Sequence, residues 1–224
     1  MPASHSKPVL CYVTNLKSLG ASRTPQDLLE RIKSALIAGV DWIQIREKNL
    51  SGRELVKLAR EAVNLARSSA SGAQARILIN DRLDVAVAAG AGGVHLGRES
   101  LPAKEVVRWR RAGNAPSGFL VGVSCHNLEE AKIAEADGAD YAFFGPIFDS
   151  PEKRQYGEPH GPARLKEVCA AIGIPVIAIG GINLENSKVC LEAGAAGIAA
   201  IRIFQETVDS SATREMIERL REIG

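Results

Sequence analysis

Three polar side chains, Gln44, Arg46 and Lys48, occupy every second position after the apolar residues Trp42 and Ile43. This alternation is typical of a β-strand, so the three side chains should emerge on one face where the strand ends. Arginine offers a fork of hydrogen-bond donors, and lysine offers a compact point charge. The pattern therefore indicates a site for a polyanionic ligand, with a solvated strand end as the alternative.

Asn80 and Asp81 follow a second apolar run, Ile77–Ile79, and present an amide beside a carboxylate. Mg²⁺ takes oxygen ligands, usually one or two carboxylates together with phosphate oxygens of a substrate. Asp81 is thus a candidate metal ligand. Because a helical pattern begins at Leu83, Asp81 could instead cap the start of that helix.

Gly180 and Gly181 also follow an apolar run and precede a helical pattern. Backbone amides that no side chain covers form an anion site at the start of a helix, so the pair is a candidate phosphate site, with a tight turn as the alternative.

His95 and His126 stand at the ends of other apolar runs. We interpret such histidines as structural groups, but an acid–base role stays open for His126.

The four cysteines show neither CxxC spacing nor a cluster with histidine at metal-ligand spacing; they are Cys11, Cys125, Cys169 and Cys190. This usage indicates reduced thiols. Cys125 as a nucleophile with His126 as its base is the weaker interpretation, because neighbours in a strand point to opposite faces.

Short β-branched segments alternate with amphipathic segments along the chain, and these elements must position the polar residues. The predicted strands are Val9–Thr14, Trp42–Arg46, Arg76–Asn80, Gly93–Leu96, Leu120–Ser124, Tyr141–Phe144, Pro175–Ile179 and Gly197–Ile201. The predicted helices are Pro25–Ala38, Gly52–Ser69, Leu83–Ala89, Ala103–Arg111, Leu128–Asp137, Pro162–Ile172, Leu184–Ala193 and Ala212–Ile223. Thr24, Ser51 and Asn127 are plausible helix starts.

A glycine recurs where a predicted helix gives way to a strand, in segments 38–41, 89–92, 137–140 and 193–196. Glycine there fits the left-handed residue that ends a helix. About eight such βα units predict an α/β fold, a single (β/α)8 TIM barrel. We expect one domain over residues 1–224, with residues 1–7 flexible. The alternative, an open doubly wound sheet, lacks its glycine-rich fingerprint after the first strand.

The connection from Gly145 to Gly161 is longer than the others and contains three prolines. Connections of this length are often lids or binding loops, with a solvated spacer as the alternative.

The net charge of +2 and the aromatic content of 4% give no indication of nucleic acid or of an acidic membrane as partner. Since no apolar run approaches the roughly 20 residues that span a bilayer, we expect a soluble, cytoplasmic protein. Barrel enzymes of this size often form homodimers, but no apolar patch identifies such a surface.

The chain resembles the thiamine phosphate synthase and thiazole tautomerase superfamily, closer to the synthase. The matching segments, in order, are QIREK (44–48), INDRLDVA (79–86), GVHLGRESLP (93–102), GVSCHNLEEA (122–131), GADYAFFGPIF (138–148), IPVIAIGGI (174–182) and GAAGIAAI (194–201). The resemblance implies condensation of 4-amino-5-hydroxymethyl-2-methylpyrimidine diphosphate with a thiazole phosphate, or with its carboxylate. The products would be thiamine phosphate and pyrophosphate. Mg²⁺ and fixed cations would stabilise the leaving diphosphate while the thiazole nitrogen attacks the pyrimidine CH₂.

The resemblance also implies roles for individual residues. The pyrimidine diphosphate would be held by Gln44, Arg46, Lys48 and Asn80, and its diphosphate region would be contacted by Ser124, Ser150 and Lys153. Asp81 would ligate Mg²⁺. The thiazole phosphate would be received by Gly180, Gly181 and the backbone at Ile201 and Arg202. Catalysis would rest on Arg46, Lys48, Ser124 and Lys153.

The chain departs from the synthase pattern at three positions. Ser100 stands where synthases usually have a second metal-binding aspartate, so Glu99 or water would replace that ligand. Glu152 stands where a phosphate-facing hydroxyl is common, and Arg202 replaces a small hydroxyl residue.

These departures keep two other functions open. One is the tautomerase, which isomerises a thiazole phosphate carboxylate by proton transfer without metal and which the chain resembles at His126. The other is a non-catalytic phosphate-ligand binder or regulator. The complete Gln-x-Arg-x-Lys pattern and the Asn80–Asp81 pair favour the synthase.

Overall fold

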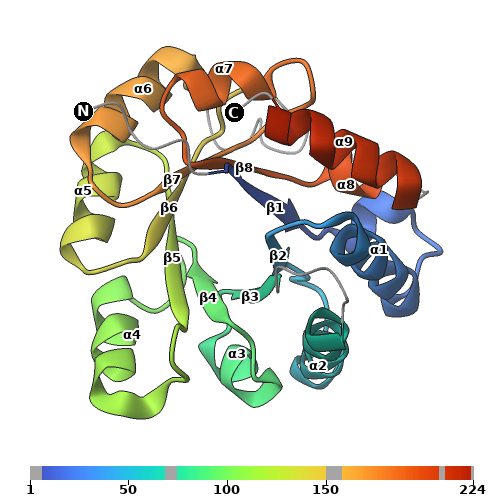
Figure 1. The fold of residues 1–224 in the computed structure, drawn as a ribbon. Helices are drawn as coiled ribbons and strands as arrows, with labels where there is room; N and C mark the ends of the chain where they lie inside the picture. Colours follow the sequence, from blue (N-terminus) through green and yellow to red (C-terminus); the bar gives the residue numbers. More distant parts are fainter. Residues whose placement is uncertain (1–6, 69–74, 150–157, 207–209, 223–224) are drawn as a thin grey trace.

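Eight parallel strands close into a barrel in which each strand pairs with its chain neighbours and β8 pairs with β1 (Figure 1). The computed structural model describes residues 7–68, 75–149, 158–206 and 210–222. The strands are β1 (Val9–Val13), β2 (Trp42–Ile45), β3 (Arg76–Asn80), β4 (Gly93–Leu96), β5 (Leu120–Cys125), β6 (Tyr141–Phe144), β7 (Val176–Ile179) and β8 (Gly197–Ala200). The predicted (β/α)8 barrel is confirmed, and the open doubly wound sheet is wrong.

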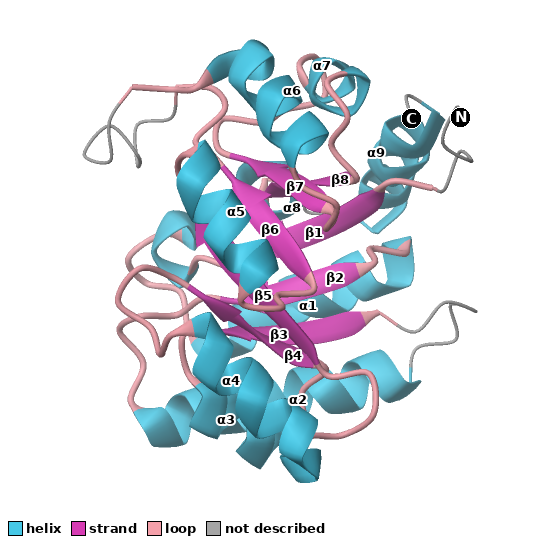
Figure 2. Cartoon of the chain, turned by 90° about the vertical axis from the view of Figure 1, so that its left-hand side faces the viewer, coloured by secondary structure: helices cyan, strands magenta, loops and turns pink. Residues whose placement is uncertain are grey.

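Helices surround the strands on the outside (Figure 2). They are α1 (Pro25–Ala38), α2 (Gly52–Ser68), α3 (Leu83–Ala89), α4 (Ala103–Trp109), α5 (Leu128–Ala136), α6 (Gly161–Ala171), α7 (Ser187–Glu192), α8 (Arg202–Gln205) and α9 (Ser210–Glu222). Two further short helical turns are η1 (Leu16–Leu19) and η2 (Arg110–Asn114). The predicted strand ends agree with the observed ones to within one residue.

Local signals set most helix ends. Thr24 forms a capping box with Asp27 at the start of α1. Asn127 Oδ1 accepts a hydrogen bond from the Glu130 backbone amide at 2.8 Å at the start of α5. The four glycines expected to end helices have a left-handed backbone, with φ between 65° at Gly90 and 98° at Gly194. These predictions are confirmed because each depends on neighbours within one helical turn.

The prediction for α7 was wrong at its start, and α8 and η1 were missed. Asn183 Oδ1 accepts hydrogen bonds from the backbone amides of Glu185 at 3.0 Å and Asn186 at 2.9 Å. This side chain holds the segment in a turn, so α7 begins at Ser187 instead of Leu184. The short helices α8 and η1 span four residues each, too few for an apolar period to reveal them.

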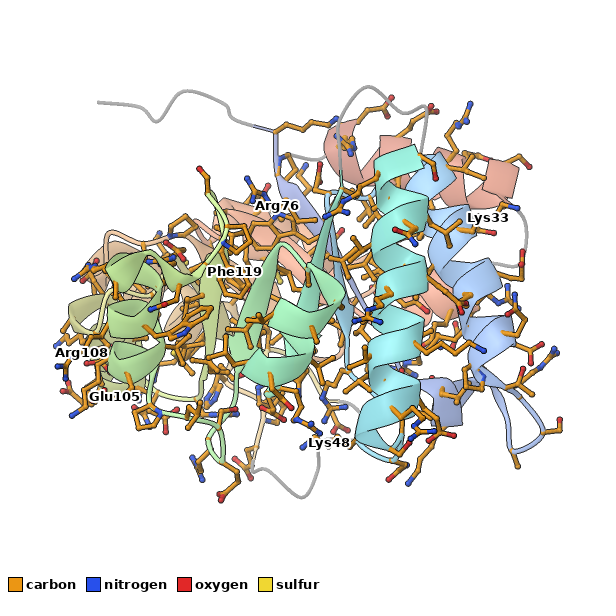
Figure 3. The ribbon with its side chains drawn as sticks, turned by 90° about the horizontal axis from the view of Figure 1, so that it is seen from below. Lys33, Lys48, Arg76, Glu105, Arg108 and Phe119 are labelled. Carbon is orange, nitrogen blue, oxygen red and sulfur yellow. The ribbon has the colours of Figure 1, made fainter. Side chains whose placement is uncertain are left out.

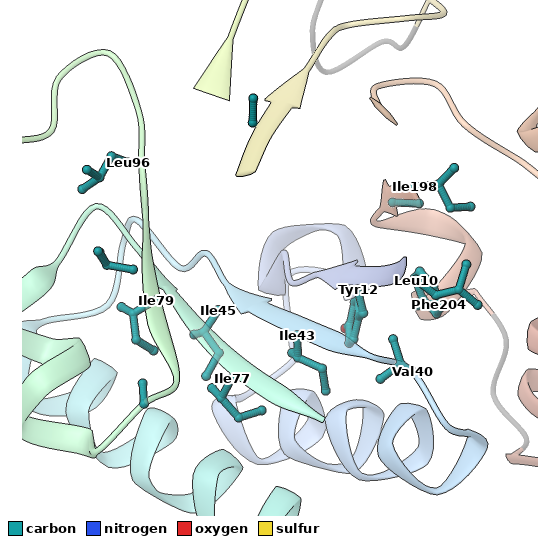
Figure 4. Packing of buried hydrophobic residues seen from close by; sticks show 14 of the residues in the cluster. Leu10, Tyr12, Val40, Ile43, Ile45, Ile77, Ile79, Leu96, Ile198 and Phe204 are labelled. Atoms are coloured by element: carbon teal, nitrogen blue, oxygen red, sulfur yellow. The ribbon is translucent and has the colours of Figure 1, made fainter. Parts of the chain in front are cut away.

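The strands are buried on both faces. Residues pointing outward pack against the helices, and Figure 4 shows Ile43 and Ile45 of β2 beside Ile77 and Ile79 of β3 on that side. The opposite face fills the barrel interior with a second cluster, formed by Cys11, Val13, Leu78, Tyr141, Phe143, Ile177 and Ala199. Burial on both faces explains why the strands are nearly continuous apolar runs. No helix in the described ranges has the length and apolar character needed to cross a membrane.

Gly122 makes room for the Tyr141 ring in the barrel interior. A Cβ added there would lie 2.0 Å from Cζ of Tyr141. We expect Gly122→Ala to lower the free energy of unfolding by about 1–3 kcal/mol, because the ring must move into a filled interior. Urea unfolding measures this change. Gly92→Ala is the control, since its Cβ would meet ordinary contacts at 3.5 Å or more; equal losses in the two variants would contradict the prediction.

Candidate active site

The carboxyl ends of all eight strands lie at one end of the barrel because the strands are parallel. In Figure 3, Lys48 lies at the opposite end from Arg76, where β3 begins, and from Phe119, which precedes β5. Arg46 and Lys48 follow β2, and Asn80 is the last residue of β3. The predicted polar residues that follow the strands therefore share the end that holds the active site in barrels of this kind.

A chain of hydrogen bonds joins three of the predicted residues. The Gln44 side chain is buried, and its Nε2 donates to Asn80 Oδ1 at 2.9 Å. Asn80 Nδ2 donates in turn to Asp81 Oδ2 at 2.5 Å. The pairing of β2 with β3 places Gln44 opposite Leu78, two residues before Asn80, so both side chains lie on the interior face.

Asp81 is held in an unusual conformation. Its φ is 62°, and among the residues that the structure describes it is the only non-glycine with a positive φ. Its Oδ1 accepts hydrogen bonds from Ser100 Oγ at 2.5 Å and from the Gly97 backbone amide at 3.2 Å. The N-cap position of α3 is Arg82, so the capping role considered for Asp81 is wrong. A strained residue fixed at the end of a strand is typical of a functional position.

The residues considered for the metal differ in position. Ser100 contacts Asp81 directly, whereas Glu99 is exposed. Within the described ranges, no three histidine, cysteine, aspartate or glutamate side chains come together as a metal site. Each carboxylate oxygen accepts about two hydrogen bonds, so Oδ1 is fully used and Oδ2 keeps one position for a cation. This donor set fits Mg²⁺ if phosphate oxygens and water complete its coordination.

His95 lies inside the barrel between two hydroxyl groups. Its Nδ1 is 3.1 Å from Tyr141 Oη, and its Nε2 is 2.8 Å from Ser124 Oγ. The ring also packs against Phe143, with 4.2 Å between centroids and the two planes tilted by 40°. This environment agrees with the structural interpretation of His95 and links it to Ser124 at the carboxyl end of β5. Tyr141 was not among the predicted residues, because its place opposite Gly122 depends on the register of β5 and β6.

His126 is tied to an acidic side chain on α5. Its Nδ1 lies 3.1 Å from Glu130 Oε2, and its backbone amide donates to the same oxygen at 2.7 Å. Burial opposes the charge of Glu130, but the hydrogen bonds from His126 outweigh it and lower the pKa of that carboxyl. Burial raises the pKa of the neighbouring Cys125 thiol to about 12. A thiol that stays protonated at neutral pH is a poor nucleophile, which argues against the Cys125–His126 pair.

Gly180 and Gly181 form a tight turn against the segment after β6. Their φ values are 103° and 66°, and a Cβ at Gly181 would lie 2.6 Å from the Asp149 carbonyl oxygen. Because α7 begins only at Ser187, the expected helix start directly after the glycines is wrong. By contrast, α8 begins at Arg202, immediately after Ile201. The glycine pair and Ile201–Arg202 follow adjacent strands, β7 and β8.

The structure describes the two ends of the long connection after β6. Ser150, Glu152 and Lys153 lie outside the described residues, so their predicted contacts and the predicted lid remain predictions. The two described ends of the connection are joined. The His160 backbone amide donates to the Pro146 carbonyl at 2.9 Å, and the Gly161 amide donates to that of Ile147 at 3.0 Å.

The closed barrel and the polar side chains at the carboxyl ends of its strands define a (β/α)8 barrel of the enzyme type. The sequence model of the family described as thiamine monophosphate synthase matches residues 10–204. The chain belongs to this family. The resemblance inferred from its motifs is thereby confirmed.

Individual relatives agree with this assignment. A putative thiamine-phosphate synthase of Geobacter sulfurreducens is 47% identical over 176 residues, which cover 79% of this chain and 78% of the relative. The thiamine-phosphate synthase of Methanoculleus marisnigri is 40% identical over 210 residues, 93% of this chain and 94% of the relative. The solved structure of a thiamine phosphate pyrophosphorylase from Pyrococcus furiosus superposes with a TM-score of 0.79 and 32% identity, covering 96% of both chains.

Proposed function

We propose that this protein is a thiamine-phosphate synthase, a transferase that joins 4-amino-5-hydroxymethyl-2-methylpyrimidine diphosphate to a thiazole phosphate with release of pyrophosphate. The observation that carries the proposal is the hydrogen-bonded series from Gln44 through Asn80 to Asp81, in a chain of this family whose Arg46 and Lys48 follow β2 at the same end of the barrel. Its partners are small molecules. The expected homodimer stays a prediction.

Arg46 and Lys48 hold the diphosphate in this proposal. The reaction needs negative charge to be stabilised as it develops on the leaving diphosphate, and cations placed in advance supply that stabilisation without further reorganisation. Arg46 is half-buried and Lys48 is exposed. The guanidinium therefore binds with less competition from water, while the ammonium reaches the ligand from the solvent side.

Asp81 is the residue that would hold Mg²⁺, together with phosphate oxygens of the substrate. The metal would neutralise charge on the departing diphosphate. Asn80 and Ser100 orient the Asp81 carboxylate through the two shortest bonds that it accepts, at 2.5 Å each. Ser124 and Lys153 would contact the diphosphate region, and Gly181 with the Ile201–Arg202 backbone would receive the thiazole phosphate.

The test is turnover with defined substrates. The purified protein, supplied with Mg²⁺ and both precursors, should release pyrophosphate and form thiamine phosphate in equal amounts. Running the assay with plain and with carboxylated thiazole phosphate identifies the preferred acceptor. Absence of product with both acceptors would refute the proposal.

A second candidate function is the metal-independent tautomerisation of thiazole phosphate carboxylate. The contact between His126 Nδ1 and Glu130 Oε2 favours it, because a carboxylate that orients an imidazole is typical of proton-transfer sites. Isomerisation in the presence of EDTA that is lost in His126→Ala would establish this activity. Binding of thiazole phosphate with neither turnover would indicate a regulator instead.

Ser100→Asp should lower the Mg²⁺ concentration that gives half-maximal rate by about tenfold, since metal affinity rises with the number of charged ligands. The new carboxylate would stand beside Asp81, where Ser100 Oγ now lies 2.5 Å from Oδ1. Rates measured across a Mg²⁺ titration give the value. Ser100→Ala is the control for loss of the hydroxyl. Glu99→Gln tests whether the exposed Glu99 carboxylate already binds the metal. If the Mg²⁺ concentration for half-maximal rate were unchanged in Ser100→Asp, position 100 would not lie next to the metal.

A further inference from the structure

The backbone of Arg46 is fixed by a residue to which the proposed reaction assigns no role. Thr14 follows β1 and its side chain is fully buried. Its Oγ1 accepts a hydrogen bond from the Arg46 backbone amide at 3.0 Å and donates to Glu47 Oε1 at 2.6 Å. The hydroxyl thus joins the backbone of Arg46 to the side chain of the next residue.

Glu47 extends this contact to a third residue. Its Oε2 accepts a hydrogen bond from the Leu16 backbone amide at 2.9 Å, and the Thr14 amide donates to the Gln44 carbonyl at 2.9 Å. Four hydrogen bonds therefore join residues 14–16 to residues 44–47. We call Thr14 and Glu47, with these bonds, the β1–β2 clasp.

The Glu47 carboxylate lies in a place that disfavours its charge. Burial raises its pKa, and the hydrogen bonds from Thr14 and Leu16 offset only part of that effect. A solvated glutamate at the end of a strand would avoid this cost. Glu47 lies between Arg46 and Lys48 in the chain. These two cations are the residues assigned to the diphosphate, so the clasp holds the segment that carries them.

The other end of the clasp is anchored as well. In η1, Ser18 Oγ donates to Gln205 Oε1 at 3.1 Å, and Gln205 Nε2 donates to the Asn15 carbonyl at 3.0 Å. Gln205 belongs to α8 and is buried. Residues 15–18 are therefore held against the β8 side of the barrel, and they give the clasp a support that is independent of β2.

From this geometry we infer that Thr14 and Glu47 are positioning residues, which fix the Arg46–Lys48 segment in the conformation that binds the diphosphate. The identity of the ligand rests on the proposed function. Long cationic side chains lose conformational freedom on binding, and a backbone fixed beforehand reduces that loss. A hydroxyl and a carboxylate that hydrogen-bond to backbone amides and to each other can thus determine affinity without touching the substrate.

The experiment compares Thr14→Val, which keeps the shape and removes the hydroxyl, with Thr14→Ser, which keeps the hydroxyl. We expect Thr14→Val to raise KM for the pyrimidine diphosphate at least tenfold and to leave KM for the thiazole phosphate within twofold of wild type. Thr14→Ser should stay within threefold of wild type for both substrates. Ser68→Ala is the control, because it removes a hydroxyl that donates to the Asn64 carbonyl within α2 and takes no part in the clasp or its anchor.

A second measurement does not need turnover. Calorimetric titration with pyrophosphate and Mg²⁺ should give a dissociation constant at least tenfold weaker in Thr14→Val than in wild type. If Thr14→Val does not fold, as judged by circular dichroism, Glu47→Ala replaces it with the same expected changes. Equal rises in both KM values, unchanged pyrophosphate affinity, or failure of Thr14→Ser to restore binding would overturn the inference. A wild-type protein that binds pyrophosphate but makes no thiamine phosphate would refute the proposed function and leave the inference testable by titration.

Discussion

Asp81→Asn should lower kcat/KM for thiamine phosphate formation by about 10³-fold, which corresponds to about 4 kcal/mol of transition-state stabilisation. The variant removes the negative charge that would hold Mg²⁺ and keeps the size of the side chain. Steady-state rates at saturating Mg²⁺, with both precursors varied, measure the loss. We also expect the Mg²⁺ concentration for half-maximal rate to rise at least tenfold.

The fold should tolerate this variant. Asparagine adopts a positive φ more readily than most residues, so the backbone at φ 62° stays accessible. Asp84→Asn is the matched control, because this exposed aspartate of α3 pairs with Arg82 and lies outside the proposed site. A loss of less than threefold in Asp81→Asn, or an equal loss in Asp84→Asn, would contradict a metal-binding role for Asp81.

Arg46→Met should lower kcat/KM by about 10²- to 10³-fold, the usual effect of removing one preorganised donor from a developing charge. Methionine keeps much of the aliphatic stem of the half-buried arginine, so the change tests the guanidinium. The effect should appear in KM for the pyrimidine diphosphate and in kcat, and not in KM for the thiazole phosphate. Initial rates with each substrate varied in turn separate these constants.

Arg46→Lys should recover part of the lost activity, because an ammonium supplies the charge without the fork of donors. Arg53→Met is the control: Arg53 is an exposed cation at the start of α2 that lines a groove between α2 and α3. If Arg53→Met lost as much activity as Arg46→Met, general surface charge would explain the result, and Arg46 would have no specific role.

The part of this protein that could be predicted is the part that depends on near neighbours in the chain. Strand and helix order follows from apolar periodicity, and helix ends follow from residues such as Thr24 and Gly90, which act within one turn. The place of Arg46 and Lys48 after β2 likewise follows from where the apolar run ends. Where a side chain redirected the backbone locally, as Asn183 does before α7, periodicity alone failed.

By itself, the sequence determined a (β/α)8 barrel of this family and the residue types at the carboxyl ends of its strands, because period and spacing are properties of the chain. Only the tertiary structure decided the partners of those residues. Asp81 accepts a hydrogen bond from Ser100, nineteen positions away, and Thr14 contacts Glu47 across thirty-three. Such contacts depend on strand register and barrel closure, which bring distant residues within 3 Å. No local pattern specifies those distances.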